Sequence, residues 1–225
     1  MNSAINAYED GFLSYGNMLE NLASNGGEIN EMKKLSPVEA QMVGNNLNIV
    51  VYANASNVEG DAEFASNVSY KSIVIKGIEA FSGQIEGINI NVKVRYGESN
   101  SHKTINVEFY HGNKRSYAYG YTSVVYSAAK DPEEGDAVRN IIYTTAHEAG
   151  GHCAFRLQDA YRDAFSNRPN LKNVDSIMNN HYGGVTDLDR AMLVRAYKLG
   201  DFTKEIYFQD NTDLLDKYSK RWGWQ

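Results

Sequence analysis

Cysteine, concentrated positive charge and long apolar segments are all scarce in this sequence, and each shortage excludes a class of protein. Cys153 is the only cysteine, so no internal disulfide framework can hold the chain together. No segment approaches the roughly 20 consecutive apolar residues that a membrane-spanning helix needs. Residues 1–30 carry acidic side chains and contain no apolar run long enough for a signal peptide. We therefore expect neither a transmembrane segment nor a signal peptide in this chain.

The charge of the chain argues against a nucleic-acid partner. The formal net charge is −6, and the basic residues come in separated pairs such as Lys33-Lys34 and Lys114-Arg115. Proteins that follow a phosphate backbone usually present a concentrated basic face to it. With 225 residues, of which 42% are hydrophobic, the chain can bury a substantial core, and we expect a single domain over residues 1–225.

Apolar residues alternate with a period of two through the middle of the chain, which predicts a sheet. The expected strands are residues 47–51, 72–75, 88–94, 105–109 and the tyrosine-rich segment 117–126. The tyrosines of this last strand more often line one face of a strand than form a ligand cage. Turn-rich stretches separate the strands.

A period of three to four residues predicts helices on both sides of this region of the sequence. The expected helices are residues 8–22, 36–44, 138–148, 154–165 and 186–200. Ser36 and Pro37 are typical of a helix N-cap and first turn, and Thr186 and Asp189 have the pattern of a cap before a helix that ends at Gly200. Helices and strands together indicate the mixed α/β (α+β) class.

The strongest chemical signal is the sequence HEAGGH at residues 147–152. Two histidines four residues apart on a helix lie about 40° apart and can share one Zn²⁺, while the glutamate beside the first faces a metal-bound water. His147 and His152 are five residues apart, which a regular α-helix would place roughly 140° apart. Either the match is accidental, or the helix is distorted at Gly150 and Gly151.

A distorted helix is the interpretation that we prefer. A π-type bulge inserts one residue, often occurs at functional sites, and is made easier by two consecutive glycines. We therefore expect His147 and His152 to bind a metal and Glu148 to act as the catalytic base, and we expect an irregular helix at Gly150 and Gly151.

Three further residues are candidates for the third ligand or for the oxyanion site. Asp159 follows His152 by seven residues, about two helical turns, and can return to the same side as a third ligand. It could also accept a hydrogen bond from a liganding imidazole, or be a solvated helix charge. His181 is the alternative third ligand. His181 and Tyr182 lie beside Gly183, and either could donate to an oxyanion.

Met178 and Cys153 each allow a functional and a structural interpretation. A methionine in a turn beneath the metal is a feature of one group of zinc peptidases, so Met178 in the sequence SIMNN is a candidate Met-turn residue; alone, such a methionine more often fills a core. Cys153 could be a thiolate ligand or a nucleophile, but no other Cys/His arrangement supports that role. We interpret Cys153 as a small buried residue.

These residues give the sequence a resemblance to the metzincin-like zinc peptidases, closest to the bacterial immunoglobulin-A-peptidase-type family. The resemblance extends over about residues 5 to 200. It rests on residues 147–152, on LQDAY at 157–161 and on SIMNN at 176–180, with weaker similarity at 47–53 and 140–145. Two positions differ: Gln158 stands where metzincins have a third histidine, and Ala160 stands where the family has a glutamate.

The resemblance implies a zincin-like mixed twisted sheet with an active-site helix, a bound Zn²⁺ and a peptide or protein substrate. Residues 1–152 would form the subdomain with the sheet and the active-site helix, and residues 153–225 a smaller helical subdomain. It also implies export to the periplasm or cell surface. The activity would be that of a metallopeptidase, in which Glu148 transfers a proton from the metal-bound water to the leaving amine. An extended peptide would pair along residues 117–126.

Two other functions stay open. The chain could be a catalytically inactive relative that binds protein or glycan through the tyrosine-rich strand, an interpretation that the extra residue at Gly150 and Gly151 favours. The presence of Glu148 argues against it, because a binding module needs no base there. The metal could also be purely structural, with no open coordination position.

Overall fold

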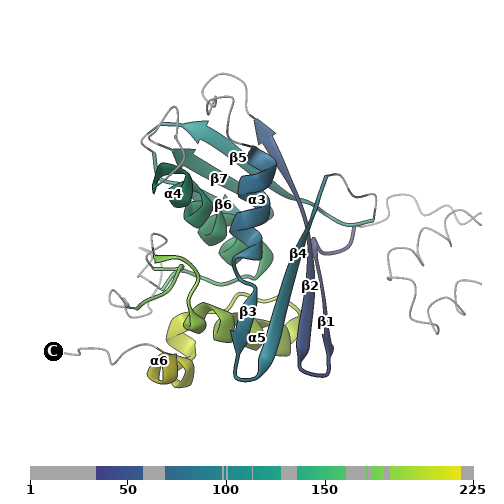
Figure 1. Cartoon of the computed structure of the whole chain (residues 1–225), viewed down its shortest axis with the longest axis vertical. Helices are drawn as coiled ribbons and strands as arrows, with labels where there is room; N and C mark the ends of the chain where they lie inside the picture. Colours follow the sequence, from purple (N-terminus) through teal and green to yellow (C-terminus); the bar gives the residue numbers. More distant parts are fainter. Residues whose placement is uncertain are drawn as a thin grey trace, which may run out of the picture.

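The computed structural model describes residues 34–57, 69–97, 99, 101–112, 114–127, 136–160, 171, 174–179 and 183–218. Within these residues the chain is a mixed α/β protein with a mixed sheet of seven strands and four α-helices (Figure 1). The helix expected at residues 8–22 lies outside the described residues. In the part of the chain that the structure describes, no helix is both long and apolar enough to cross a membrane.

The sheet has the strand order β3-β4-β2-β5-β7-β6, and β1 pairs with β2 beside this path. The central strands β4, β2, β5 and β7 are parallel, whereas β1, β3 and β6 each pair antiparallel. β6 is therefore an antiparallel edge strand. The strands are β1 (Val38–Val43), β2 (Asn46–Asn57), β3 (Gly83–Ile85), β4 (Ile88–Tyr96), β5 (Ile105–His111), β6 (Tyr117–Tyr119) and β7 (Thr122–Ser127).

Two of the α-helices, α3 and α4, pack on the sheet, and the other two, α5 and α6, come last in the described part of the chain. α3 and α4 contact each other as well as strands of the sheet, and α4 continues directly into the π-helix η1. These helices are α3 (Tyr70–Glu79), α4 (Asp136–Thr145), η1 (Ala146–Ala154), α5 (Asp187–Gly200) and α6 (Thr212–Tyr218), and a short 3-10 turn η3 (Phe208–Asp210) precedes α6. At Gly77 of α3, an added Cβ would lie 2.9 Å from the Cβ of Thr145, so this glycine permits close approach to the end of α4.

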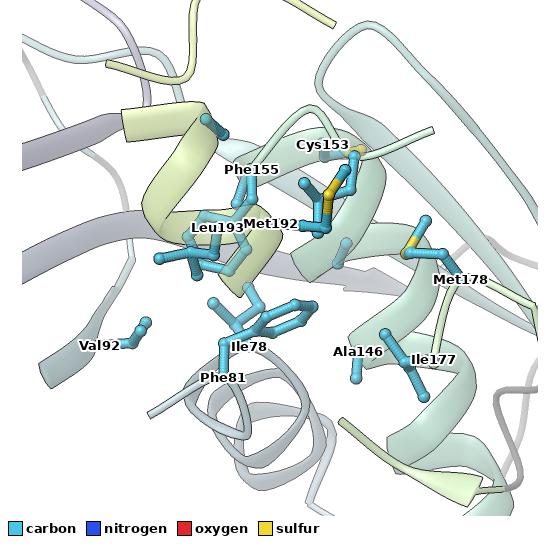
Figure 2. Packing of buried hydrophobic residues seen from close by; sticks show 14 of the residues in the cluster. Ile78, Phe81, Val92, Ala146, Cys153, Phe155, Ile177, Met178, Met192 and Leu193 are labelled. Atoms are coloured by element: carbon cyan, nitrogen blue, oxygen red, sulfur yellow. The ribbon is translucent and has the colours of Figure 1, made fainter. Parts of the chain in front are cut away.

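The core runs from the sheet through η1 to the C-terminal helices as one cluster of buried hydrophobic residues. Phe155 joins its two ends: its ring meets the Phe81 ring at 4.8 Å and the Phe202 ring at 5.4 Å, both nearly edge to face. Figure 2 shows Phe81, Phe155 and Leu193 grouped between α3, η1 and α5. The helix that carries the histidines is thus packed on both sides.

The expected strands 47–51, 88–94 and 105–109 are confirmed as parts of β2, β4 and β5. The strand expected at 72–75 is wrong, because these residues lie in α3. Its β-branched run favoured a strand, but the Ser69 side chain caps the helix by accepting from the Ser72 N–H, and Ile73, Val74 and Ile78 are buried. Tertiary burial and the cap decide the structure here.

The helix expected at 36–44 is also wrong, because residues 38–43 form β1. The Ser36 hydroxyl does accept from the Val38 N–H, as a cap would, but the chain continues extended. Gly44, with φ 57°, turns it back into β2, and Val38 then lies opposite Val51. The pairing with β2 outweighs a local cap of only one hydrogen bond.

Residues 117–126 were expected as a single strand and form a hairpin instead. Gly120 has φ 58°, a conformation that favours glycine, and it divides the segment into β6 and β7.

Two expected helices are confirmed. In α5, the capping box of Thr186 and Asp189 and the helix end at Gly200 are as predicted. The helix expected to carry Val138 to Glu148 is confirmed as α4 and the start of η1.

Candidate metal centre

His147 and His152 are brought together by a π-helix. Residues 146–154 form nine residues of π-helix, in which hydrogen bonds join each N–H to the carbonyl five residues earlier; the last of them runs from Phe155 N–H to Gly150 O, at 3.0 Å. The two imidazole rings therefore lie on one face, with centroids 4.9 Å apart and planes at 89°. The predicted irregularity is confirmed, and it extends over the whole motif.

Close packing, and not an unusual backbone conformation, accounts for the two glycines. Neither has a φ in the left-handed region. An added Cβ on Gly150 would lie 2.8 Å from the Phe81 ring, and one on Gly151 would lie 2.2 Å from the Sδ of Met178. The glycine pair thus lets α3 and the turn at Met178 press directly on the helix that carries the histidines (Figure 2).

Both imidazoles are oriented by backbone carbonyls. His147 Nδ1 lies 2.7 Å from Ile177 O, and His152 Nδ1 lies 2.8 Å from Leu157 O. A carbonyl only accepts, so each Nδ1 carries a proton, and a ring in its neutral form has its lone pair on Nε2. This tautomer is the one that presents Nε2 to a metal.

Asp159 points at both of these nitrogens. Its Oδ1 lies 3.3 Å from His147 Nε2 and 3.2 Å from His152 Nε2. The same oxygen is buried and accepts no well-formed hydrogen bond from the described residues. Two atoms bound to one tetrahedral Zn²⁺ at about 2.0–2.1 Å are separated by roughly 3.3 Å. Both distances from the Asp159 Oδ1 therefore match the spacing of ligands around one ion.

Glu148 is the other carboxylate of the centre. The donor atoms of His147, Glu148 and His152 all lie within 4.8 Å of one another, which by itself would also permit a metal site. The Glu148 Oε1 is 3.9 Å from His147 Nε2, farther than the Asp159 Oδ1. Asp159 thus fits the third ligand position, and Glu148 stands beside it.

Asp159 does not reach the centre along a helix, so the helix expected at 154–165 is wrong over the described residues. The helix ends at Ala154, and Leu157 then forms a parallel bridge with Ile206. The Gln158 N–H donates to Ile206 O at 2.8 Å, and the Ala160 N–H donates to Met178 O at 3.1 Å. Backbone hydrogen bonds on both sides of Asp159 fix its position.

The turn at residues 176–178 lies against the π-helix, where Ile177 O accepts from His147 and Met178 packs on Gly151. Asp189 of α5 anchors this turn. Its carboxylate accepts from Ser176 Oγ at 2.5 Å and from the Ile177 N–H at 2.9 Å, and the side chain is fully buried. The capping signature identified Asp189, but nothing in the sequence indicated that it also holds the turn.

A cleft of about 380 Å³ opens on the centre along the edge strand β6. Its lining comes from the segment before and within β6, from η1, and from the segment that carries Asp159. The lining residues are Arg115, Ser116, Tyr117, Ala118, Tyr119, Gly120, His147, Glu148, His152, Arg156, Gln158, Asp159 and Glu205. The sequence did not indicate Arg115, Arg156 or Glu205 as cleft residues.

The pKa values of the two carboxylates are shifted in opposite directions. Burial raises the pKa of Glu148 above its ordinary value, although the nearby His147 and His152 oppose the change. For Asp159, burial also tends to raise the pKa, but the two imidazoles outweigh it and hold the pKa of that carboxyl well below its usual range. The Asp159 carboxyl is therefore ionised, and Glu148 is a stronger base than an exposed glutamate.

The remaining candidates have different outcomes. Burial raises the pKa of the Cys153 thiol to about 12, and its Sγ lies 3.5 Å from Thr122 O. Cys153 is thus a buried neutral thiol, in line with its interpretation from the sequence. His181 and Tyr182 lie outside the described residues.

Comparison of the sequence with protein-family models and with curated proteins, and of the structure with solved structures, finds no match. The resemblance to metzincin-like peptidases therefore stays a prediction from the sequence. The geometry of the centre is the ground on which a function can be assigned.

Proposed function

We propose that this chain is a zinc-dependent peptidase whose metal is held by His147, His152 and Asp159. One observation carries the proposal: a buried carboxylate oxygen lies 3.2 to 3.3 Å from two Nε2 atoms without accepting a well-formed hydrogen bond, and both imidazoles have their Nδ1 protons committed to backbone carbonyls. Two imidazoles and one carboxylate are a ligand set of catalytic zinc sites, in which a fourth position stays open.

The bound Zn²⁺ would polarise the scissile carbonyl and lower the pKa of its water to about 7. Glu148 is suited to receive a proton from that water, because it lines the same cleft and burial raises its pKa. It would then deliver the proton to the leaving amine. A purely structural metal would need neither an open cleft nor a base beside it.

The substrate would be an extended peptide that lies along β6. This strand lies at the edge of the sheet formed by the described residues and lines the cleft, so a peptide can form main-chain hydrogen bonds with the side of β6 that pairs with no described strand. A mixed sheet with an antiparallel edge strand beside the metal-binding helix is also what a zincin-like fold requires, and we include that fold in the proposal.

The test combines metal analysis with peptide cleavage. Purified protein should bind about one zinc per chain and cleave members of a broad peptide library. Glu148→Gln should keep the zinc and lose activity by roughly 100-fold to 10,000-fold, the range for a general base. Asp216→Asn, on the exposed face of α6, is a matched control that removes a remote carboxylate and should leave activity unchanged. Failure of the protein to bind zinc after reconstitution would refute the proposal.

One observation favours a second candidate, a binding module without catalysis. Tyr117 and Tyr119 of β6 are 49% and 57% exposed, and their rings stack with centroids 6.0 Å apart. Exposed aromatic pairs of this kind are suited to contact a protein or a glycan. Zinc binding without cleavage of any library peptide would support this candidate over the peptidase.

A further inference from the structure

Arg156 lines the cleft and has a backbone conformation that arginine rarely adopts. Its φ is 58°, in the left-handed region. Phe155 is the C-cap of the π-helix, so Arg156 occupies the next position, where glycine is the usual residue. The Leu157 N–H then donates to Gly151 O at 2.9 Å and closes the helix end. Ending the helix explains the backbone conformation, but it does not explain an arginine side chain.

The guanidinium of Arg156 is held at one end of the edge strand. It lies over the Tyr121 ring, 4.8 Å from the centroid, and its Nη1 donates to Gly120 O over a long 3.4 Å. No aspartate or glutamate among the described residues forms an ion pair with it. Its charge is therefore positioned by an aromatic ring and a carbonyl, and no described carboxylate neutralises it.

The charges of the cleft lining favour an anion. Glu148 and Asp159 together balance the double charge of a zinc ion. Of the other charged residues of the lining, Glu205 accepts from the Tyr207 hydroxyl at 2.7 Å, whereas Arg156 has no carboxylate partner among the described residues. Arg156 lies beside the far end of β6, so a peptide along β6 would pass this guanidinium.

We propose that Arg156 makes the cleft selective for peptides that carry a carboxylate close to the scissile bond. The carboxylate comes from an aspartate or glutamate side chain, or from the C-terminus of the peptide. The planar guanidinium can bind either group through two parallel hydrogen bonds, which fixes the register of the peptide along β6. This inference rests on the proposed peptidase function and names its substrate class.

The test measures binding as well as cleavage. A set of fluorescent peptides differs only by Glu or Gln at positions scanned across the scissile bond, and each is made with a free or an amidated C-terminus. Binding is measured on the zinc-loaded Glu148→Gln protein, so that no turnover interferes. The preferred peptide should bind roughly tenfold to a hundredfold more tightly with its carboxylate than with the matching amide, as expected for a hydrogen-bonded charge pair.

Three variants in the Glu148→Gln background identify the residue responsible. Arg156→Gln should remove the preference for the carboxylate, whereas Arg156→Lys should retain part of it. Lys93→Gln removes a side chain that is 76% exposed on β4, far along the sheet from β6, and should change nothing. The free and amidated peptides show whether the carboxylate comes from a side chain or from the chain end.

Each result separates the inference from the function on which it rests. Equal binding of acid and amide peptides, or binding of none, overturns the inference. A fall in melting temperature of Arg156→Gln with equal weakening of all peptides also overturns it, because Arg156 would then only brace the turn at Gly120. An Arg156-dependent preference in binding, with no cleavage by the unsubstituted protein, supports the inference and contradicts the peptidase.

Discussion

The candidate metal centre has two parts, the histidines of the π-helix and Asp159, and they are held in place in different ways. His147 and His152 come from one helix, so their relative position follows from the π-helical hydrogen bonds and five residues of spacing. Asp159 comes from an irregular segment, and its position depends on hydrogen bonds to Ile206 and Met178, which are distant in the sequence. A helix fixes two of the proposed ligands locally, whereas the proposed third ligand requires the tertiary structure around it.

Removing Asp159 should have the largest effect on the centre. Asp159→Ala deletes one of the three proposed ligands, so zinc affinity should fall by more than about 100-fold, beyond the range found when only residues behind the ligands are changed. Asp159→Asn keeps the shape of the side chain and one oxygen but loses the charge. Zinc affinity should therefore fall less in Asp159→Asn than in Asp159→Ala. Competition with a chelator of known affinity measures both.

Glu148→Ala is the matched variant for this comparison, because it removes the other carboxylate of the centre. It should keep zinc affinity within a few fold of the unsubstituted protein while losing activity. The opposite pattern, with zinc lost in Glu148→Ala and kept in Asp159→Ala, would show that the third ligand is Glu148 and that the assigned roles are exchanged.

Substitution of Asp189 tests whether the centre depends on the turn at residues 176–178, which Asp189 anchors. Four donors meet its carboxylate, from Ser176, Ile177 and twice from Thr186. Asp189→Asn replaces one acceptor with an amide donor, so one or more of these hydrogen bonds must break. We expect a loss of about 1–3 kcal/mol in the free energy of unfolding and roughly 10-fold to 100-fold in zinc affinity.

Thr186→Ala separates the two roles of Asp189. It removes the capping hydroxyl of α5 but leaves the bonds from Ser176 and Ile177 intact. It should cost about 1 kcal/mol of stability and leave zinc affinity unchanged. If both variants weaken zinc binding equally, Asp189 acts only by capping α5. Chemical denaturation and chelator competition provide the two measurements.

The same contrast explains what the sequence could predict. The pattern HEAGGH, with one residue too many for an α-helix, was enough to predict an irregular helix with both histidines on one face. The sequence predicted that Asp159 lies beside the two histidines. It did not predict the irregular backbone that carries Asp159 there, because the bridge between Leu157 and Ile206 leaves no local pattern.

Local patterns failed where distant partners decide the structure. The β-branched run at Ile73 and Val74 favoured a strand, but burial and the Ser69 cap make a helix. Asp189 and Arg156 were missed as site residues for the same reason: their roles depend on a turn and a cleft that other segments complete. Site residues that lie on one helix can be predicted from the sequence, whereas a site that several segments build can be identified only from the fold.

Gly151 lies where the two parts of the candidate metal centre touch, and its substitution should affect zinc binding less than the substitutions of Asp159 and Asp189. In Gly151→Ala, the new Cβ would lie 2.2 Å from the Met178 Sδ, so the methionine must move. We expect a loss of about 1–3 kcal/mol in the free energy of unfolding, as for other overpacked cores, measured by denaturant titration. If contact with Met178 is the cause, Gly151→Ala should cost much less in a Met178→Ala background, where the space is free. An equal cost in both backgrounds would instead place the strain in the π-helix itself, and the glycine would then be needed for the backbone and not for packing.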